Sequence, residues 1–312
     1  MKHIVIMGSL LVLVILIHSL AVKPEAYRNI FILAGQSNMA GRGGVVEDTA
    51  TGITTWDGVI PPQCNPKPSI LRLNAELEWV EAQEPLHQDI DAKKTNGVGP
   101  GMSFANSILN KREGFGVVGL VPCAIGGTNI SQWEKGKVLY KHMMKRVKAS
   151  LNDGGSIRGF LWYQGESDTV NLNDAQSYQT RIHKFFIDVR NDLQSPLLPI
   201  IQVALASGQG PYKDIVRQAQ QSIDLLNLRT VDALGLPLEP DGLHLTTQAQ
   251  VNLGQMMADS FLQFVPSSIP QQLVSPTTNR NEARTRPYNC ASHNYIFSLF
   301  IRFLIIISLI FL

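Results

Sequence analysis

The sequence predicts an α/β protein, a three-layer α/β/α sandwich built around a parallel sheet of about five strands. Short, continuous apolar runs alternate along the chain with segments of helical periodicity. This alternation is typical of parallel strands joined by right-handed crossover helices. Of the 312 residues, 44% are hydrophobic, which is enough to bury such a sheet on both faces.

The predicted strands are apolar runs at 30–34, 115–121, 157–163, 199–205 and 228–233. Helices are expected between and after them, at about 101–111, 135–149, 174–193, 212–227 and 247–264. The helix at 174–193 has the clearest period, with an apolar stripe formed by Ala175, Tyr178, Ile182, Phe185, Val189 and Leu193. Thr246 or Thr247 is expected to cap the last helix.

One segment, 41–98, does not follow the alternation. It is rich in Gly, Pro, Asp and Asn, and it contains Trp56 and Trp79. A long stretch without regular structure inside a compact domain is usually functional or folded on itself. We expect it to be a substrate-facing excursion packed beside the site, and not a separate domain.

Both ends of the chain differ in composition from the region 27–265, which is predicted to be the folded domain. Residues 1–21 are typical of a secretory signal, with an uncleaved membrane anchor as the alternative. This favours a secreted or cell-wall protein. Residues 266–294 have the composition of a disordered linker. The apolar tail 295–312, interrupted by Arg302, would be a membrane anchor, a lipid-anchor signal or an extension without a role.

The charge is nearly balanced, with 27 basic and 25 acidic residues, so no nucleic-acid partner is expected. Three cysteines (Cys64, Cys123 and Cys290) have neither metal-ligand spacing nor a disulfide framework, although one pair could form. Whether Cys64 pairs with Cys123 is left open. No metal, cofactor or protein partner is inferred.

A candidate nucleophile follows the first predicted strand. The run Ile30–Ala34 ends at Gly35, and Ser37 comes next in the block Gly35-Gln36-Ser37-Asn38. Open α/β sheets bind ligands at the carboxyl ends of their strands, so a serine there is well placed for attack. Taken alone, this pattern also fits an ordinary strand-to-helix turn with a capping serine.

A candidate base and its partner lie about 200 residues later, in Asp241-Gly242-Leu243-His244. A serine nucleophile needs a histidine base, and the base needs an acceptor that fixes its tautomer. Asp241 and His244 could supply both from a single loop. By itself this motif also fits a surface loop with a capping aspartate.

Two further blocks fall after predicted strands: Gly126-Gly127-Thr128 and Gln164-Gly165-Glu166-Ser167-Asp168. Since the carboxyl ends of parallel strands share one edge of the sheet, all four blocks are predicted to meet there. This convergence favours a catalytic site over four unrelated turns.

Together the four blocks resemble the SGNH (GDSL-like) hydrolases, and within them the sialate O-acetylesterase-like carbohydrate esterases of family six. The resemblance covers about residues 27–265 and implies a flavodoxin-like sandwich. It implies Ser37 as nucleophile, His244 as base and Asp241 as its orienting carboxylate. The backbone N–H groups of Ser37 and Gly127, with Gly126 as the alternative to Gly127, would then bind the oxyanion.

Within that resemblance, the roles of Asn38, Gln164 and Glu166 have still to be assigned. The wider superfamily has an Asn oxyanion donor in the third block, where this chain has Gln164-Gly165-Glu166. Gln164 is therefore the expected third donor, because an ionised Glu166 cannot donate. Asn38 and Glu166 are expected to contact the substrate, with bracing of the loop as the alternative for Glu166.

The expected reaction is hydrolysis of an O-acetyl ester on a carbohydrate through an acyl-enzyme. A lipase or general carboxylesterase with the same three residues is one alternative, although the polar, tryptophan-containing segment after Ser37 favours a sugar. A non-catalytic carbohydrate-binding protein on the same scaffold is the other.

Overall fold

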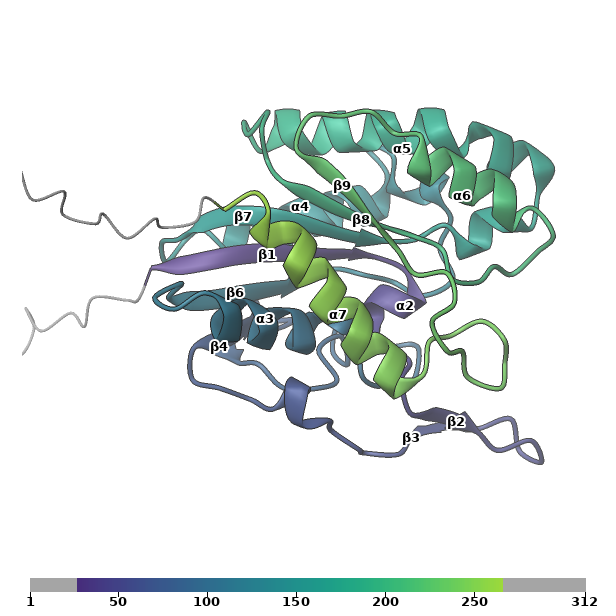
Figure 1. The fold of residues 1–312 in the computed structure, drawn as a ribbon, viewed down its shortest axis with the longest axis horizontal. Coiled ribbons are helices and arrows are strands. Elements are labelled where there is room, and N and C mark those ends of the chain that lie inside the picture. The colour runs from purple at the N-terminus through teal and green to yellow at the C-terminus, as the bar shows by residue number, and fades with distance from the viewer. Residues whose placement is uncertain (1–26, 266–312) are drawn as a thin grey trace, which may run out of the picture. The chain divides into compact units, whose positions relative to one another are not determined.

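The computed structural model describes residues 27–265 (Figure 1). The predicted secretory signal, linker and C-terminal tail lie outside the described residues. Within 27–265, no helix combines the length and apolarity that crossing a bilayer requires.

A mixed sheet of seven strands forms the centre of the fold, in the order β5-β4-β6-β1-β7-β8-β9. The strands are β1 (Arg28–Gly35), β4 (Ile70–Leu73), β5 (Trp79–Glu81), β6 (Val117–Pro122), β7 (Ser156–Tyr163), β8 (Ile200–Ala204) and β9 (Leu228–Asp232). All neighbours pair in parallel except β4 and β5, which are antiparallel. The predicted α/β fold is confirmed, with more strands than expected.

The central strand is β1, which pairs with β6 on one side and β7 on the other. Its residues Ile30 to Ala34 are all fully buried. An uninterrupted apolar run fits this place, because a central parallel strand is covered on both faces.

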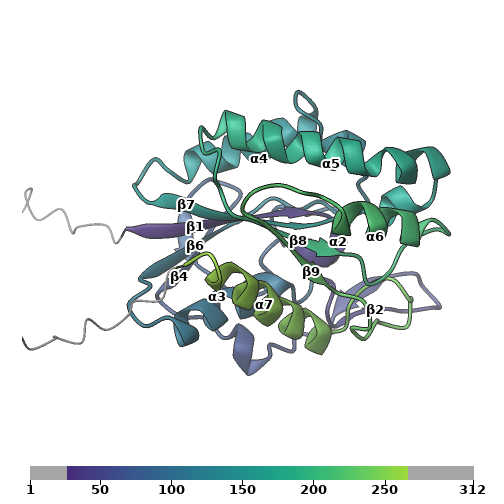
Figure 2. The same ribbon diagram turned by 45° about the horizontal axis from the view of Figure 1, so that its top comes forward.

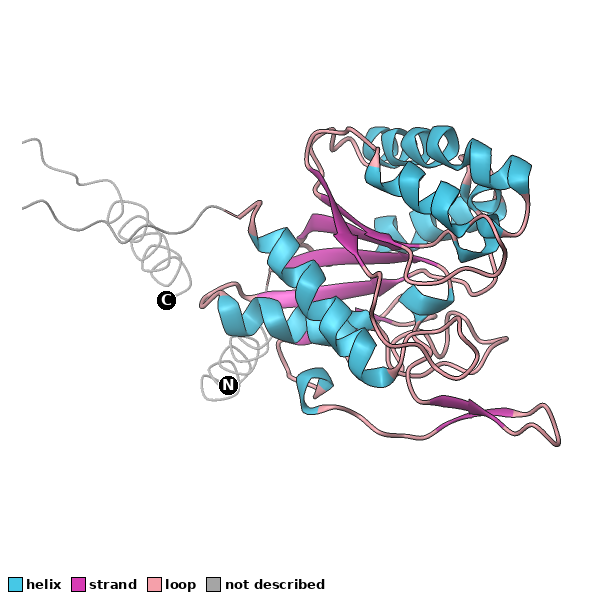
Figure 3. Ribbon diagram, turned by 45° about the vertical axis from the view of Figure 1, so that its right-hand side comes forward, coloured by secondary structure: helices cyan, strands magenta, loops and turns pink. Residues whose placement is uncertain are grey.

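The extra strands come from the segment 41–98, which was expected to contain none. β4 and β5 extend the sheet at one edge, and β2 (Val45–Glu47) and β3 (Thr54–Trp56) form a hairpin outside it (Figure 3). All four strands are short, so no apolar period develops in the sequence. A 3-10 turn, η1 (Pro62–Cys64), lies between β3 and β4.

Helices cover both faces of the sheet (Figure 2). One face carries α4 (Val138–Ala149), α5 (Leu172–Asp192) and α6 (Lys213–Gln221), and the other carries α3 (Pro100–Lys111) and α7 (Thr247–Leu262). The helix α6 ends earlier than predicted. Thr246 caps α7, since its side chain accepts a hydrogen bond from the backbone N–H of Ala249 at 3.3 Å.

Aromatic clusters fill the core on each side of the sheet. The ring of Phe31 on β1 meets Phe104 of α3 and Phe261 of α7 edge-on, with centroids 4.9 and 4.8 Å apart. On the other face, Trp162 of β7 packs on Phe185 of α5 at 4.6 Å. These large, fully buried side chains fix the helices against the sheet and hold the strand ends that carry the site.

Candidate active site

Ser37 begins the short helix α2 (Ser37–Ala40), directly after β1. The turn before it depends on Gly35, which has a φ of +132°. A Cβ added at Gly35 would lie 2.0 Å from the carbonyl oxygen of Tyr163 on β7, so no side chain fits there. Position 35 therefore requires glycine because the backbone of β7 passes so close to it.

The structure brings Ser37, His244 and Asp241 into one hydrogen-bonded line. The ring Nε2 of His244 lies 3.0 Å from the Oγ of Ser37, and its Nδ1 lies 2.6 Å from Oδ2 of Asp241. This is the order that nucleophile, base and orienting carboxylate require.

The turn that carries Asp241 and His244 is held by the aspartate itself. The Oδ1 of Asp241 accepts hydrogen bonds from the backbone N–H groups of Leu243 at 2.8 Å and His244 at 2.9 Å. Partial burial raises the pKa of Asp241, but these N–H groups and the His244 ring outweigh it, so the pKa lies below its usual value. The carboxylate therefore stays ionised at neutral pH.

Asn38, the residue after the serine, holds the same turn from inside. Its Oδ1 accepts a hydrogen bond from the backbone N–H of Leu245 at 2.9 Å, and its Nδ2 donates to the carbonyl of Leu243 at 3.3 Å. These contacts lie on both sides of His244 in sequence. Nδ2 also donates to Oε1 of Glu166 at 2.8 Å.

Asn38 and Glu166, which were expected to contact the substrate, are both fully buried. Burial raises the pKa of Glu166 to about 7, against the lowering effect of the hydrogen bond from Asn38. Both side chains lie beneath the turn and contact the protein, so this position does not suit direct contact with a sugar. It suits the alternative, bracing of the loop.

Gln164, the expected third oxyanion donor, also lies in the interior and is fully buried. Its amide nitrogen donates to the carbonyl of Thr128 at 2.9 Å and to Oδ2 of Asp168 at 2.6 Å. An amide has two N–H groups, and these two acceptors use both of them within the protein. This arrangement does not suit donation to an oxyanion.

Gly126 and Gly127 form a turn that borders Ser37. A Cβ added at Gly126 would lie 3.5 Å from the Cβ of Ser37, whereas one added at Gly127 would meet nothing within 4 Å. Gly127 has a φ of +72° and is exposed. The turn therefore presents backbone, and no side chain, at Gly126 beside Ser37 and at the exposed Gly127.

A buried ion pair that the sequence analysis missed supports this turn. Arg42 and Asp91, 6% and 3% exposed, form a hydrogen-bonded salt bridge, and Oδ2 of Asp91 accepts the backbone N–H of Gly126 at 3.2 Å. Arg42 also donates to Oδ1 of Asn96 at 2.8 Å. Arg42 and Asp91 are far apart in sequence and follow no period. The only sequence signal for this ion pair is the position of Arg42 shortly after Ser37.

Two other features bear on the chemistry. Cys64 and Cys123 are buried and free, and burial raises the pKa of Cys123 to about 11, so neither is an activated thiolate. Within residues 27–265, no group of three or more His, Cys, Asp or Glu side chains is placed to hold a metal ion.

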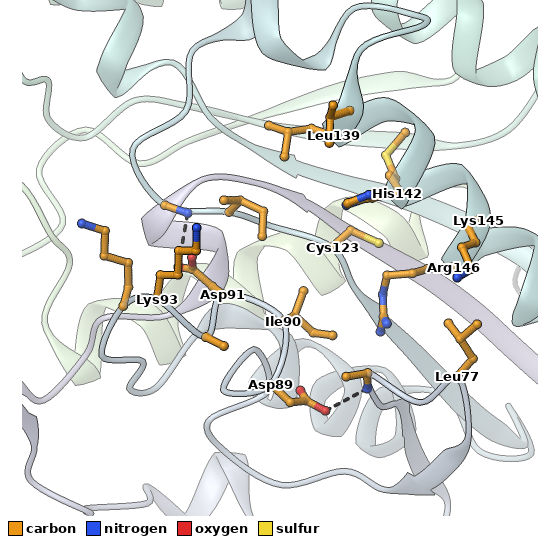
Figure 4. A pocket seen from close by; sticks show the side chains of 17 residues that line it. Leu77, Asp89, Ile90, Asp91, Lys93, Cys123, Leu139, His142, Lys145 and Arg146 are labelled. Atoms are coloured by element: carbon orange, nitrogen blue, oxygen red, sulfur yellow. Dashed lines mark hydrogen bonds between the residues drawn. The ribbon is translucent and has the colours of Figure 1, made fainter.

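A cavity of about 610 Å³ opens beside the Gly126 turn, between α4 and the loop 89–94 (Figure 4). Its walls are partly apolar, with Ile90, Ile125 and Leu139 among the lining residues. A volume of a few hundred cubic ångströms is typical of small-ligand sites.

The chain matches a known protein family over nearly all of its described residues. The family model described as "Carbohydrate esterase, sialic acid-specific acetylesterase" matches residues 27–263. A probable carbohydrate esterase of Arabidopsis thaliana, At4g34215, is 55% identical over 241 residues, which are 77% of this chain and 92% of the relative. The crystal structure of that Arabidopsis protein superposes with a TM-score of 0.74 at 53% identity, over 76% of this chain and 98% of that one.

More distant structures share the fold. NanS has a TM-score of 0.61 at 17% identity, covering 76% of this chain and 97% of its own. XAC1771 of Xanthomonas citri, a carbohydrate acetylesterase, has a TM-score of 0.54 at 16% identity, covering 75% and 56%. With the family match over most of its length, this chain belongs to the sialic acid-specific acetylesterase family of carbohydrate esterases.

Proposed function

We propose that this carbohydrate esterase hydrolyses O-acetyl esters of sugars with Ser37 as nucleophile, His244 as base and Asp241 as its orienting carboxylate. The observation that carries the proposal is the line of contacts from Ser37 Oγ to His244 Nε2 at 3.0 Å and from His244 Nδ1 to Asp241 Oδ2 at 2.6 Å. The family supports an ester of a carbohydrate as the substrate.

In the first step the Oγ of Ser37 attacks the acetyl carbonyl carbon while His244 takes the hydroxyl proton. The tetrahedral intermediate then collapses, the bond from carbon to the sugar oxygen breaks, and His244 returns its proton to that oxygen. Water then attacks the carbonyl carbon of the acetyl-serine while His244 takes its proton. The bond from that carbon to Oγ of Ser37 breaks, His244 returns the proton to Oγ, and acetate is released. Asp241, held ionised by its hydrogen bonds, stabilises the imidazolium in both steps.

The oxyanion of each intermediate would be bound by backbone N–H groups, from Ser37 and from Gly127. The exposed, unobstructed turn at Gly127 supports this assignment. Gln164 is not proposed as a donor in the hole, because its two N–H groups are used inside the protein. Asn38 and Glu166 are instead proposed to position the turn that carries His244.

The test is an assay of the full chain on p-nitrophenyl acetate. Ser37→Ala should reduce kcat by several orders of magnitude, since loss of a nucleophile leaves only what binding and the oxyanion hole provide. Ser222→Ala, an exposed serine at the end of α6, is the matched control and should keep full activity. A burst of p-nitrophenol equal to the enzyme concentration would identify the acyl-enzyme.

Retention of more than about a tenth of the wild-type kcat by Ser37→Ala would remove the serine from the mechanism. If the wild type itself did not hydrolyse p-nitrophenyl acetate, the alternative in which the scaffold only binds carbohydrate would be favoured.

A further inference from the structure

The cavity beside the Gly126 turn shares this turn with the candidate nucleophile, although Ser37 itself does not line the cavity. Gly126 lines the cavity, and a Cβ added there would lie 3.5 Å from the Cβ of Ser37. Asp91, whose carboxylate accepts the N–H of Gly126, lines the same end, and Lys93 lies beside it (Figure 4). The Gly126 turn therefore borders both Ser37 and the cavity.

Cationic side chains surround the cavity at both ends. Lys93 and Lys94 lie on the loop, and Lys145 lies at the opposite end on α4 (Figure 4). All three are exposed, and none of them forms a salt bridge with another described residue. Long lysine stems can line an apolar wall while the ammonium group stays at the rim.

The acidic residues of the cavity do not offset this charge. Asp89 is paired with Arg72 at 2.6 Å, and Asp91 is paired with Arg42. In contrast, Arg146 lines the cavity, is 8% exposed and donates to the carbonyls of Pro122, Asn74 and Leu73. Neutral carbonyls leave its charge uncompensated, so the cavity carries a net positive charge.

The charge continues along the outside of α4. From 135 to 150 the sequence contains six Lys and Arg residues and no Asp or Glu: KGKVLYKHMMKRVKAS. Lys141 and Lys148 are exposed and line a second hollow, which adjoins the first at Lys145. The whole chain has a net charge of only +2, so this concentration is local.

From these observations we propose that the cavity and the adjoining surface of α4, which we call the cationic surface (Lys93, Lys94, Lys141, Lys145, Arg146 and Lys148), bind the carboxylates of an acidic, uronate-containing polysaccharide. The inference rests on the proposed function, because it places the acetyl ester of that polymer at Ser37. The apolar walls of the cavity would contact the sugar rings, and the lysines would pair with carboxylates on neighbouring residues of the polymer. A neutral glycan would gain nothing from these charges.

The experiment uses the full chain and two polymers acetylated to the same degree, polygalacturonate and xylan. The wild-type kcat/KM should favour the acidic polymer by tenfold or more at low salt. The preference should shrink as NaCl is raised to about 0.3 M, because salt screens exposed charges beyond a few ångströms. In the variant Lys93→Gln/Lys94→Gln/Lys145→Gln, the ratio of kcat/KM on acetylated polygalacturonate to that on p-nitrophenyl acetate should fall by tenfold or more.

The matched control removes three exposed or surface lysines elsewhere, in Lys67→Gln/Lys111→Gln/Lys184→Gln, and should leave that ratio unchanged. Lys111 lies on α3 and Lys184 on α5, away from the cavity. Equal rates on the two wild-type polymers would overturn the proposal, and so would an equal fall of the ratio in both variants.

Binding separates this inference from the proposed function. Unacetylated polygalacturonate should bind to Ser37→Ala. It should bind at least tenfold more weakly to the Lys93/Lys94/Lys145 variant than to Ser37→Ala. Unacetylated xylan should bind weakly to both variants. If Ser37→Ala stays active, the proposed mechanism fails while this binding comparison still decides the inference. Equal binding of the two unacetylated polymers would overturn the inference and leave the mechanism in place.

Discussion

The two sides of the candidate site differ in how they are built. The turn with Asp241 and His244 is at the surface, where the side chains are 47% and 21% exposed. Beneath it, Asn38, Gln164 and Glu166 are fully buried and form hydrogen bonds to protein groups, although Oε2 of Glu166 has no partner among the described residues. The proposed chemistry is therefore carried by an exposed turn, and its geometry is set by a buried polar network.

Because of this difference, substitutions in the exposed turn and in the buried network should affect activity and the free energy of unfolding differently. The exposed side chain of Asp241 can be replaced by asparagine at little cost to the free energy of unfolding, because the oxygen that accepts from the backbone of the turn is kept. A buried side chain such as Asn38 leaves unsatisfied partners when it is removed, so stability and geometry change together. Substitutions on the two sides should separate these effects.

The largest effect on activity is expected from Asp241→Asn, with almost no change in Tm. The asparagine keeps an oxygen for the backbone N–H groups of the turn but presents an N–H to the ring of His244, which favours the wrong tautomer. The corresponding change in a serine protease lowers kcat by about 10⁴-fold. The control is Asp214→Asn, an exposed aspartate on α6. Unchanged esterase kinetics in Asp241→Asn would contradict its orienting role.

A smaller loss of activity, combined with a loss of stability, is expected from Asn38→Ala. The backbone N–H of Leu245 and the carboxyl of Glu166 would lose a buried partner, at about 1–3 kcal/mol for each unsatisfied group. Displacement of His244 by about 1 Å can cost on the order of 10²-fold in kcat. Urea unfolding and esterase kinetics would be measured together, with the exposed Asn173→Ala as control. A stable variant with normal kcat would show that Asn38 does not position the turn.

The support of the Gly126 turn can be tested with Asp91→Ala. This change leaves the charge of Arg42 buried and unpaired, which typically costs about 3–5 kcal/mol of unfolding free energy. Asp259→Ala removes the partner of Lys111 in an exposed pair and should cost less than about 1 kcal/mol. Because Gly126 loses its acceptor, kcat should also fall, by less than in Asn38→Ala. If Asp91→Ala and Asp259→Ala lowered the free energy of unfolding equally, the role of burial in the Arg42–Asp91 pair would be contradicted.

The smallest effect is expected from Glu166→Gln. Burial raises the pKa of Glu166 to about 7, so the folded state holds its proton more tightly than the unfolded state, whose pKa is near its usual value of about 4.3. Charging this group therefore destabilises the fold as pH rises from about 4.5 to 7. Glutamine does not ionise and can still accept from Asn38, so the Tm difference between variant and wild type should increase from pH 5 to pH 8.

The control for this pH dependence is the exposed Glu113→Gln. A Tm difference for Glu166→Gln that stays constant from pH 5 to pH 8 would contradict the raised pKa.

The sequence predicted the sheet core and the meeting of the four blocks because both depend on local patterns. The apolar run before Ser37 and those before Gly126 and Gln164 each form a strand whose carboxyl end lies at the same edge of the sheet. That the loop with Asp241 and His244 reaches this edge was also expected from the parallel topology.

The rest depended on tertiary contacts that leave no local pattern. β4 and β5 are short strands that join the sheet through the pairing of β4 with β6. The pairing of Arg42 with Asp91 joins distant residues. For Gln164, the sequence shows an amide beside the site but not which way it points, and in the fold its partners Thr128 and Asp168 are inside.

The single turn shared by Asp241 and His244 has a consequence for heat inactivation. Since the aspartate holds the backbone of its own turn, the pair would move as one rigid unit, and the distance that changes is the one to Ser37. Warming should then stop turnover before the histidine and aspartate separate. A low-field NMR signal from the proton between Nδ1 and Oδ2 would outlast catalysis, and cooling would restore the rate without refolding of the sheet.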